Sequence, residues 1–450
     1  MANRKIPTTM EQMLMKRQFS TLRKRVLPLL ISLGLGTGVY AQSLVDLYAA
    51  ARDYDANFQA AKAQKEANTY KADQSLALLL PRVDAEARWN SGLVTQDRGF
   101  SNNAMTLSAT QGLYRPADQA TYLQSRKSIA SATNALAAAE QDLILRLCQA
   151  YFDVLTVTDS LEYVKAQKVA VQEQLAFAKR NFEVGTSTIT DAREAQARFD
   201  LVLAQEIAAE NDLRVKTLAL AQLAGKPDVK PMSVAAKFNL DDFTPVDVNE
   251  WLALGQTEHP ALRQLKLALE VARLDTQKAN AANLPTVDLV GQYQTTTSNG
   301  EGGNPATNNN AYTVGFSIKL PLFAGYSIQN RIKETLSLED KSRADLETAQ
   351  RNVVQATRSA FLGVSSALGQ VRAYEAAAIS SQSALDANKL GYQVGVRINI
   401  DVLNSQSQLY DTKAKLSKAR YDVLMGSLKL RQASGILKAE DLNAINDLLR

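Results

Sequence analysis

Two turns in the chain share a motif whose side chains can form strong polar contacts. In each turn a Val-Gly pair is followed, six positions after the glycine, by an aspartate: Val184-Gly185 with Asp191, and Val394-Gly395 with Asp401. Only the second turn adds Tyr392 and Arg397. An arginine beside a carboxylate forms a charge-assisted hydrogen bond that is stronger than a neutral one. The chemistry that these residues offer is reversible, non-covalent contact.

The same aspartates could simply cap the helices that begin at them. Aspartate is among the preferred N-terminal caps of helices. In "DARE", Glu194 follows Asp191 by three residues, as in a capping box. On residue types alone we favour capping for Asp191 and Asp401, and ordinary packing for Tyr392.

Residue combinations typical of enzymes are missing from the sequence. His259 is the only histidine and Cys148 the only cysteine, so one chain can build neither a histidine-based triad nor a multi-histidine metal site. The glycine-rich stretch 300–304 lies in a polar loop and does not precede a helix, which argues against a phosphate-binding loop. Trp89 and Trp251 are too few for an aromatic nucleic-acid platform. We therefore expect no enzyme activity, no cofactor, no metal and no nucleic-acid partner.

The basic residues are concentrated at the N-terminus. Of the residues in 1–41, seven are among the 51 basic residues and one is among the 46 acidic residues, so the net charge of +5 arises there. This stretch combines a basic segment, the apolar run "VLPLLISLGLGTG" and small residues at a cleavage position, which is typical of an export signal. We predict a signal peptide over 1–41, with a short membrane anchor as the alternative.

A stretch of 68 residues, 117–184, contains neither glycine nor proline. As a helix it would be about 100 Å long, and such a length calls for partner helices along its side. Two series of residues spaced by seven, apolar except for Lys168, indicate a coiled-coil seam. They are Leu143, Ala150, Val157, Val164, Val171 and Ala178, and Leu147, Val154, Leu161, Lys168, Leu175 and Phe182. A similar stretch, 186–224, follows the turn, so we predict a helical hairpin over 117–224.

The plan of the first half recurs in the second. Each half has a Leu-Pro pair before an alternating stretch, then the Val-Gly turn, and then a similar ending, "ALAQLAGK" or "KLRQASGI". A repeat of this length indicates a tandem duplication and not a solenoid of short units. We predict a first repeat over 42–230, a middle linker over 231–249, and a second repeat over 250–450 with its own helical hairpin over 326–433.

Alternating apolar and polar residues predict two pairs of strands, at about 83–114 and 287–323. In "YTVGFSIKLPLF", 312–323, every second residue is apolar. Polar loops over 91–103 and 298–310 would join each pair. Strands of about ten residues suit an outer-membrane sheet, and a small soluble sheet is the alternative. Because open edges leave backbone groups unpaired in lipid, four membrane strands would need further copies of the chain, and three copies would supply an allowed even number.

Taken together, these features resemble the TolC-type outer-membrane efflux family. The resemblance runs from about Ser43 to the C-terminus, and rests on "LLPRVDAEA", "TDAREAQARFD", "LPTVDL", "FSIKLPLFAG", "VVQATRSAF" and "GYQVGVRINIDVLNSQ". It implies a mixed α and transmembrane β fold: a homotrimer whose 12-stranded β-barrel, four strands per protomer, lies in outer-membrane lipid and continues as a long α-helical coiled-coil tunnel through the periplasm. It also implies docking to a periplasmic adaptor (membrane fusion) protein and an inner-membrane transporter, and export of drugs or polypeptides.

The resemblance assigns a gate to the two turns. It implies that the periplasmic end closes by coiling of an inner helix pair and opens by uncoiling. The family's closed-state latches match Tyr392 with Asp191, and Arg397 with Thr190 or Asp191. The second turn then belongs to the moving helix pair.

Two further roles are implied by the resemblance. Asp401 matches a constriction ring of aspartates, which would attract cations, whereas Asn404 stands where the family has a second aspartate. The turns themselves, Val184-Gly185 and Val394-Gly395, match the family's contact with the adaptor. For the glycines, an ordinary turn requirement is the alternative.

A protein of another class shares some of these features: a periplasmic coiled-coil adaptor or scaffold without a membrane barrel. It would have the helical hairpins. However, it should also bring a lipoyl-like or small barrel domain, and it would not need two strand pairs with apolar faces. The strand pairs therefore favour the channel.

Overall fold

The same order of elements occurs twice along the chain. The computed structural model describes residues 42–94, 98–234, 245, 247–299 and 307–449, so the predicted signal peptide over 1–41 lies outside the described residues. The first series is α2 (Leu44–Tyr54), α3 (Ala56–Leu76), η1 (Ala77–Leu79), β1 (Arg82–Val94), β2 (Arg98–Tyr114), α4 (Pro116–Glu183) and α5 (Ile189–Ala224). The second is α6 (Val248–Glu258), α7 (Pro260–Ala281), β3 (Thr286–Asn299), β4 (Thr307–Lys319), α8 (Ser327–Gln393) and α9 (Asn399–Ala433), followed by α10 (Asp441–Asn446).

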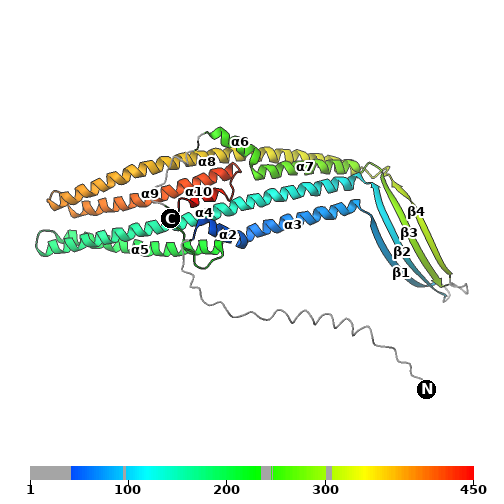
Figure 1. Ribbon diagram of the computed structural model, residues 1–450, viewed down its shortest axis with the longest axis horizontal. Coiled ribbons are helices and arrows are strands. Elements are labelled where there is room, and N and C mark those ends of the chain that lie inside the picture. Colours follow the sequence, from blue (N-terminus) through cyan, green and yellow to red (C-terminus); the bar gives the residue numbers. More distant parts are fainter. Residues whose placement is uncertain (1–41, 95–97, 235–244, 246, 300–306, 450) are drawn as a thin grey trace, which may run out of the picture. The chain divides into compact units, whose positions relative to one another are not determined.

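The four strands form one antiparallel sheet in the order β1-β2-β3-β4. The two halves meet in its centre, where β2 pairs with β3 from Ser101↔Asn299 to Tyr114↔Val287. Within the described residues, β1 and β4 each have a strand neighbour on one side only. The sheet therefore ends in two open edges, one from each half of the chain (Figure 1).

The strands extend further into the two polar loops than the alternation of residues predicts, and β4 ends earlier on the side of the helices. The ladders reach Val94↔Arg98 and Ser298↔Thr307, so the predicted loops over 91–103 and 298–310 are too long. Conversely, β4 ends at Lys319 and not at 323. Pro321 explains this end, because proline has no N–H to donate to a ladder.

The long helices begin and end where the local sequence requires. Pro116 lies in the first turn of α4, where its missing N–H costs nothing. The turn after α4 is closed by two backbone hydrogen bonds, from Gly185 N to Phe182 O (3.0 Å) and from Thr186 N to Asn181 O (2.8 Å). This is the Schellman pattern, which requires a left-handed residue at the glycine position, and Gly185 has φ = 78°.

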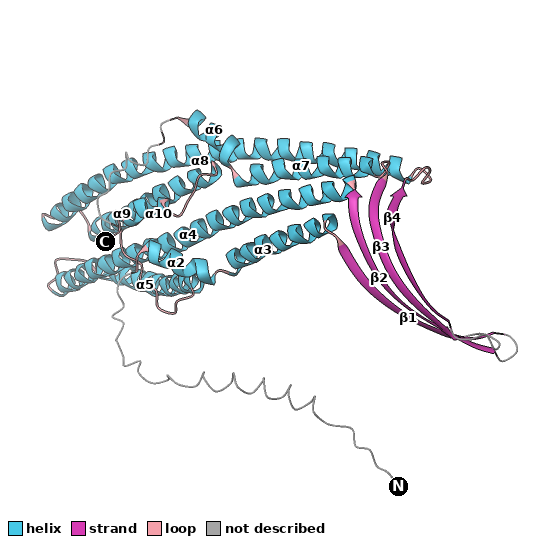
Figure 2. Cartoon of the chain, turned by 45° about the vertical axis from the view of Figure 1, so that its right-hand side comes forward, coloured by secondary structure: helices cyan, strands magenta, loops and turns pink. Residues whose placement is uncertain are grey.

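The helices pack lengthwise in pairs (Figures 1 and 2). α5 packs on α4 and α9 packs on α8, toward the turns, whereas α3 packs on α4 and α7 packs on both α4 and α8, toward the sheet. α4 also contacts α9, which joins the two hairpins. Among the described residues, no helix combines the length and the apolar character needed to cross a membrane.

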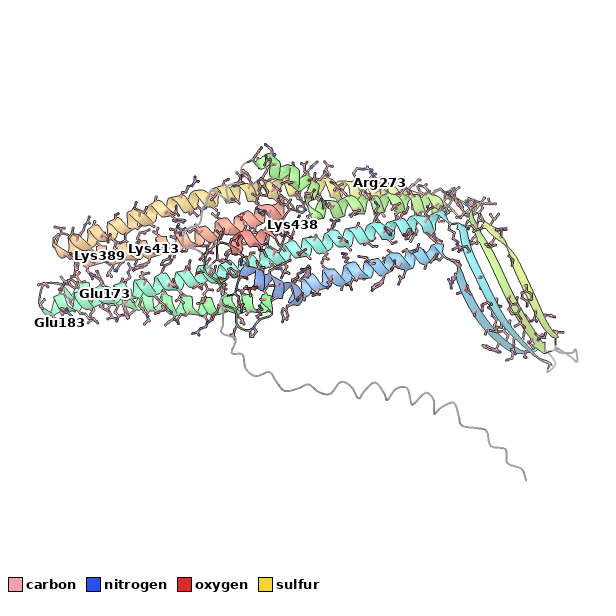
Figure 3. The ribbon with its side chains drawn as sticks, viewed as in Figure 1. Glu173, Glu183, Arg273, Lys389, Lys413 and Lys438 are labelled. Carbon is pink, nitrogen blue, oxygen red and sulfur yellow. The ribbon has the colours of Figure 1, made fainter. Side chains whose placement is uncertain are left out.

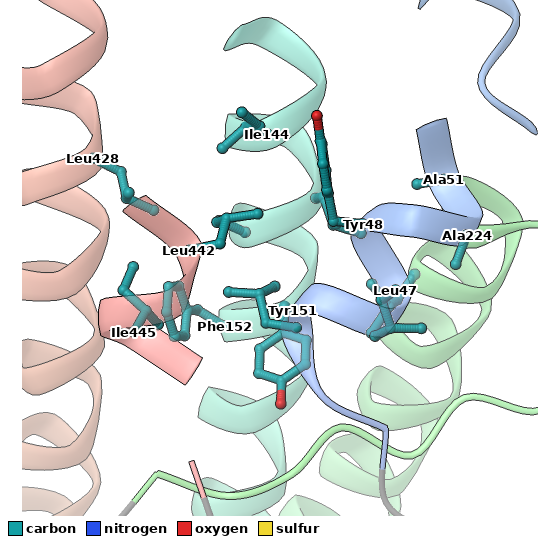
Figure 4. Packing of buried hydrophobic residues seen from close by; sticks show 14 of the residues in the cluster. Leu47, Tyr48, Ala51, Ile144, Tyr151, Phe152, Ala224, Leu428, Leu442 and Ile445 are labelled. Carbon is teal, nitrogen blue, oxygen red and sulfur yellow. The ribbon is translucent and has the colours of Figure 1, made fainter. Parts of the chain in front are cut away.

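The largest apolar core among the described residues joins both halves of the chain. It includes residues of α2, α4, α5, α9 and α10, several of them labelled in Figure 4. Phe152 of α4 stacks on Tyr421 of α9, with 5.9 Å between ring centroids. The Tyr151 hydroxyl donates to the carbonyl oxygen of Met232 in the predicted middle linker, at 2.9 Å. The part of the linker next to α5 is therefore packed on this core.

Closer to the turns, part of the predicted heptad series forms a separate apolar cluster between α4 and α5, whereas the last predicted position, Phe182, is 42% exposed. Val171, Leu175 and Ala178 of α4 are buried against Ala195 and Val202 of α5. The exception in the heptads, Lys168, is bound by Glu206 of α5 with N–O distances of 2.6 and 2.8 Å. The ion pair allows a lysine to occupy a seam position.

Candidate gate at the two helical tips

The two turns have the same backbone geometry. After α8, Gly395 N donates to Tyr392 O (3.2 Å) and Val396 N donates to Gly391 O (2.9 Å), as in the turn after α4. Gly395 has φ = 79°, close to the value at Gly185. We call the turns over 184–188 and 394–398 the first tip and the second tip.

Each tip has an exposed valine followed by a glycine with empty space beside its Cα. The side chains of Val184 and Val394 are 68% and 65% exposed. A Cβ built on Gly185 or Gly395 would have no neighbour within 4 Å. Because no described residue of the chain covers Val184, Gly185, Val394 or Gly395, each tip can contact another molecule.

Asp191 caps the first tip's return helix, but not as the residue pattern predicts. The N-cap of α5 is Thr188, whose Oγ1 accepts a hydrogen bond from Asp191 N at 3.2 Å. The Asp191 carboxylate in turn accepts from Thr188 N (3.1 Å) and from the hydroxyls of Thr188 (2.9 Å) and Ser187 (2.8 Å). The expectation that Asp191 is itself the N-cap, paired with Glu194, is therefore wrong: Asp191 is the third-position partner of Thr188.

These bonds affect the acidity of Asp191. Partial burial by itself would raise the pKa, but the hydrogen bonds from Ser187 and Thr188 stabilise the charged form, and the net pKa lies below the ordinary aspartate value. The carboxylate at the first tip is therefore ionised near neutral pH. It is available as a partner for a cation.

Asp401 does not cap α9. The N-cap position belongs to Ile398, which makes no side-chain bond. The Asp401 carboxylate instead lies 3.7 Å from Arg397, one helical turn away, as a loose ion pair. Capping as the explanation of Asp401 is therefore wrong, because the geometry directs its carboxylate to the arginine of the same tip.

Three of the four predicted latch residues lie around one cavity, but Tyr392 and Asp191 are not hydrogen-bonded to each other. Tyr392 packs edge-on against Phe177 of α4, with 6.0 Å between ring centroids. Within the described residues no hydrogen bond links the Tyr392 hydroxyl to Asp191. Asp191, Tyr392 and Arg397 nevertheless line one cavity of about 420 Å³ between the tips, whereas Thr190 is exposed outside it.

The structure adds two residues that the sequence did not single out. Asn399 is fully buried: its amide donates to the Asp191 carbonyl oxygen at 3.4 Å, and its side-chain oxygen accepts from Gln174 of α4. Arg198 of α5 donates to the side-chain oxygen of Asn404 at 2.7 Å. Both contacts attach α9 to the first hairpin, directly above the tips.

Among the charged residues near the tips that are labelled in Figure 3, Glu173, Glu183 and Lys389 are exposed and Lys413 is partly buried. No group of three or more His, Cys, Asp and Glu side chains in the described ranges could hold a metal ion. His259 serves as the cap of α7, where its Nδ1 accepts from Ala261 N at 3.2 Å. Burial lowers the pKa of this imidazole, which favours the neutral form that the cap requires.

Known proteins resemble this chain over nearly its whole length. A sequence model of the outer membrane efflux protein family matches residues 47–226 and 251–436. The chain is 33% identical to the outer membrane protein TolC of Vibrio cholerae, covering 94% of this chain and 98% of that one. It is 31% identical to the alkaline protease secretion protein AprF of Pseudomonas aeruginosa, covering 90% and 87%.

The fold is shared with solved outer-membrane proteins. The crystal structure of VceC from Vibrio cholerae superposes with a TM-score of 0.75 at 17% identity, covering 87% of this chain and 96% of that one. The sequence model leaves a gap at the predicted middle linker, and so matches one segment in each half. The resemblance inferred from the motifs is thus confirmed: the chain belongs to the outer membrane efflux protein family.

Proposed function

We propose that three copies of this chain form an export channel through the outer membrane and periplasm, gated at the two tips. The observation that carries this proposal is the four-stranded sheet with open edges on β1 and β4. Its strands are 13 to 17 residues long, enough to cross a bilayer when tilted. Copies that share one barrel would pair these edges and remove them.

The outer face of the sheet supports a lipid environment. Alternate residues of β4, namely Tyr312, Val314, Phe316 and Ile318, are all at least 70% exposed. Such a row would be unfavourable in water but matches the apolar band of a membrane barrel. A periplasmic scaffold without a barrel would have no use for it, and is therefore not favoured.

The names of relatives support our proposal for the cargo, and the reach of the channel supports our proposal for the partners. Because one relative is named for alkaline protease secretion, and the matching family is named for efflux, we include both polypeptides and drugs as cargo. A channel that ends in the periplasm needs an energised inner-membrane transporter and an adaptor to bridge to it. The exposed tips are the surfaces of the chain that we assign to the adaptor.

The gate is assigned to the cavity between the tips. In a closed state Tyr392 would bond Asp191, and Arg397 would bond Thr190 or Asp191, in the same or a neighbouring protomer. The short reach across one cavity and the ionised Asp191 support this proposal. A docked partner that binds the open form better would shift the balance toward opening.

The test is single-channel recording of the purified protein in planar lipid bilayers. A channel with a small, steady conductance is expected. A folded trimer that gives no conductance would refute the channel and restore the scaffold.

Asp401→Asn is expected to weaken block by multivalent cations. Three copies of Asp401 around an axis would concentrate cations, and Asn404, bound by Arg198, adds no second ring of charge. We therefore also expect weaker block of the unmodified channel than of a channel with two aspartate rings. Titration of a trivalent cation in planar bilayers measures both. Block that is tight and the same in Asp401→Asn would contradict the assignment.

Gly395→Asp is expected to reduce assembly with the adaptor. The substitution adds a charge and strains a backbone with φ = 79° at an exposed tip. Co-purification of a tagged adaptor after cross-linking provides the measurement. Gly363→Asp on α8 is the matched control, since a side chain there also meets open space. Unchanged co-purification of Gly395→Asp would argue against the adaptor contact.

A further inference from the structure

Exposed apolar residues flank both open edges of the sheet, at the same end. Because the strands are antiparallel, the start of β1 and the end of β4 both lie at the end that joins the helices (Figure 2). Directly before β1, residues 76–80 expose Leu76, Leu78 and Leu80. Directly after β4, residues 320–326 expose Leu320, Leu322, Phe323 and Tyr326. We call these the entry segment (76–80) and the exit segment (320–326).

The exit segment exposes two large apolar side chains that are adjacent in the sequence. Leu322 is 90% exposed and Phe323 is 77% exposed. Neighbouring apolar residues with such exposure usually mark a surface that another molecule covers. The entry segment is exposed to a lesser degree, with Leu80 at 53%.

The exit segment also has a defined conformation. Tyr326 has φ = 61°, the one positive φ of a non-glycine residue in the described chain, and it follows Gly325 at 58°. A hydrogen bond from Ser327 N to Ala324 O (3.1 Å) closes the turn. The rings of Phe323 and Tyr326 meet edge-on at 5.6 Å. A left-handed backbone at a tyrosine costs on the order of 1 kcal/mol, which is consistent with a conformation kept for contact.

The connection inside the sheet is built differently. β2 is joined to α4 by Arg115, whose guanidinium binds the Asp288 carboxylate of β3 at 2.6 and 2.9 Å. This inner junction is therefore tied by an ion pair within one chain. The two outer junctions, beside the open edges, expose apolar side chains. The entry segment is bound to β2 only through the Gln111 amide, which donates to the Leu79 carbonyl oxygen at 3.0 Å, and in the described residues no ion pair joins either outer segment to a strand.

We propose that the exit segment of one protomer packs against the entry segment of the next, forming an apolar clasp below each seam of the shared barrel. The occupant is a second copy of this chain because both segments are continuous with the edges that must pair between copies. Two different patches that bind head to tail form a ring when the rotation between copies closes, and closure after three copies would give three identical clasps. This inference rests on the proposed trimer.

Cysteine pairs test the clasp. Leu78→Cys or Leu80→Cys would be combined with Leu320→Cys or Leu322→Cys in the full-length protein, then treated with an oxidant or a short bis-maleimide. Cys148 is fully buried and should stay silent. At least one pair is expected to give covalent dimers and trimers on denaturing gels. Each single substitution, and Leu201→Cys with Leu322→Cys, are controls that should give none.

The outcomes separate the clasp from the trimer. A native trimer in which every pair fails to cross-link would overturn the clasp and leave the channel standing. A fluorophore at Leu322→Cys that is quenched by nitroxide lipids would assign the exit segment to lipid and also overturn the clasp. A protein that is monomeric in detergent and in bilayers would instead refute the proposed function.

A second variant checks that the clasp contributes to assembly. Phe323→Asp should lower the temperature at which the trimer dissociates, because it places a charge in an apolar contact. Leu254→Asp on α6, also exposed, is the matched control. Equal dissociation temperatures for the two variants would count against the clasp.

Discussion

Exchanging Arg397 for serine together with Tyr392 for phenylalanine is expected to raise the single-channel conductance several-fold. In the closed state these two residues would hold the second tip to Asp191 of the first. Each link contributes on the order of 1–3 kcal/mol, and the links occur three times in a trimer. Removing both should therefore move a two-state gate strongly toward its open form.

The choice of substitutions keeps the packing of the tip intact. Tyr392 contacts Phe177 and the apolar cluster of Leu385, Val402 and Leu409. A phenylalanine keeps the ring in this cluster and removes only the hydroxyl. A serine at Arg397 removes the charge that is 3.7 Å from Asp401 and able to reach across the cavity. An increase in conductance would thus report lost polar links and not a collapsed tip.

A matched control lies further up α9. Lys413 is 5.8 Å above the ring of Tyr410, so Lys413→Ser with Tyr410→Phe removes the same kinds of group away from the tips. This variant is expected to conduct like the unmodified channel. Equal conductance in all three proteins would keep the pore but reduce Tyr392 and Arg397 to packing residues. A similar increase in both variants would point to general loosening of the helices.

Local signals in the sequence predicted much of the tips. The Val-Gly turns, the helices on either side and the closeness of Asp191, Tyr392 and Arg397 all follow from patterns within short segments or from the family's motifs. The assignment of the cap failed because Thr188, Asp191 and Glu194 offer two overlapping capping boxes. Only the backbone shows which one forms: Thr188 has the extended conformation of an N-cap.

The contacts between the two helical hairpins could not be predicted from the sequence. Arg198 meets Asn404, and Gln174 meets Asn399, across more than two hundred positions of sequence. Which residues face each other there depends on the axial register of α9 relative to α4 and α5. Because a heptad pattern looks the same after a shift of seven residues, the sequence does not define this register. The extent of the strands was similarly underestimated, because polar residues such as Asn102 and Asn309 belong to the ladder although they look like loop residues.

Gly435→Ala is expected to destabilise the assembled protein strongly, by several kcal/mol. Gly435 ends α9 in a left-handed conformation, with φ = 76°. A Cβ there would lie 2.3 Å from the Cα and 2.7 Å from the N of His259, at the start of α7. Backbone atoms cannot rotate away, so α7 or the end of α9 must shift. Overpacking costs about 1–3 kcal/mol even where side chains can adjust, and the left-handed backbone adds on the order of 1 kcal/mol.

The position also carries contacts between the halves of the chain. Gln141 of α4 donates to the carbonyl oxygens of Gly435 (3.0 Å) and Leu437 (3.1 Å). A shift of the α9 end would weaken both bonds, and would also disturb the His259 cap of α7. The damage should therefore spread from one turn to the junction of α4, α7 and α9.

Gly185→Ala separates backbone strain from steric clash. Gly185 has nearly the same φ, 78°, but a Cβ there meets open space. If strain alone decides, the two alanine variants should lower the trimer's thermal midpoint equally. If the close approach to His259 decides, Gly435→Ala should lose several degrees more than Gly185→Ala, measured by loss of trimer on heating. Equal thermal midpoints would show that the junction of α7 and α9 can adjust to a Cβ at Gly435 at little cost. The glycine would then be needed only for the left-handed backbone at the end of the helix.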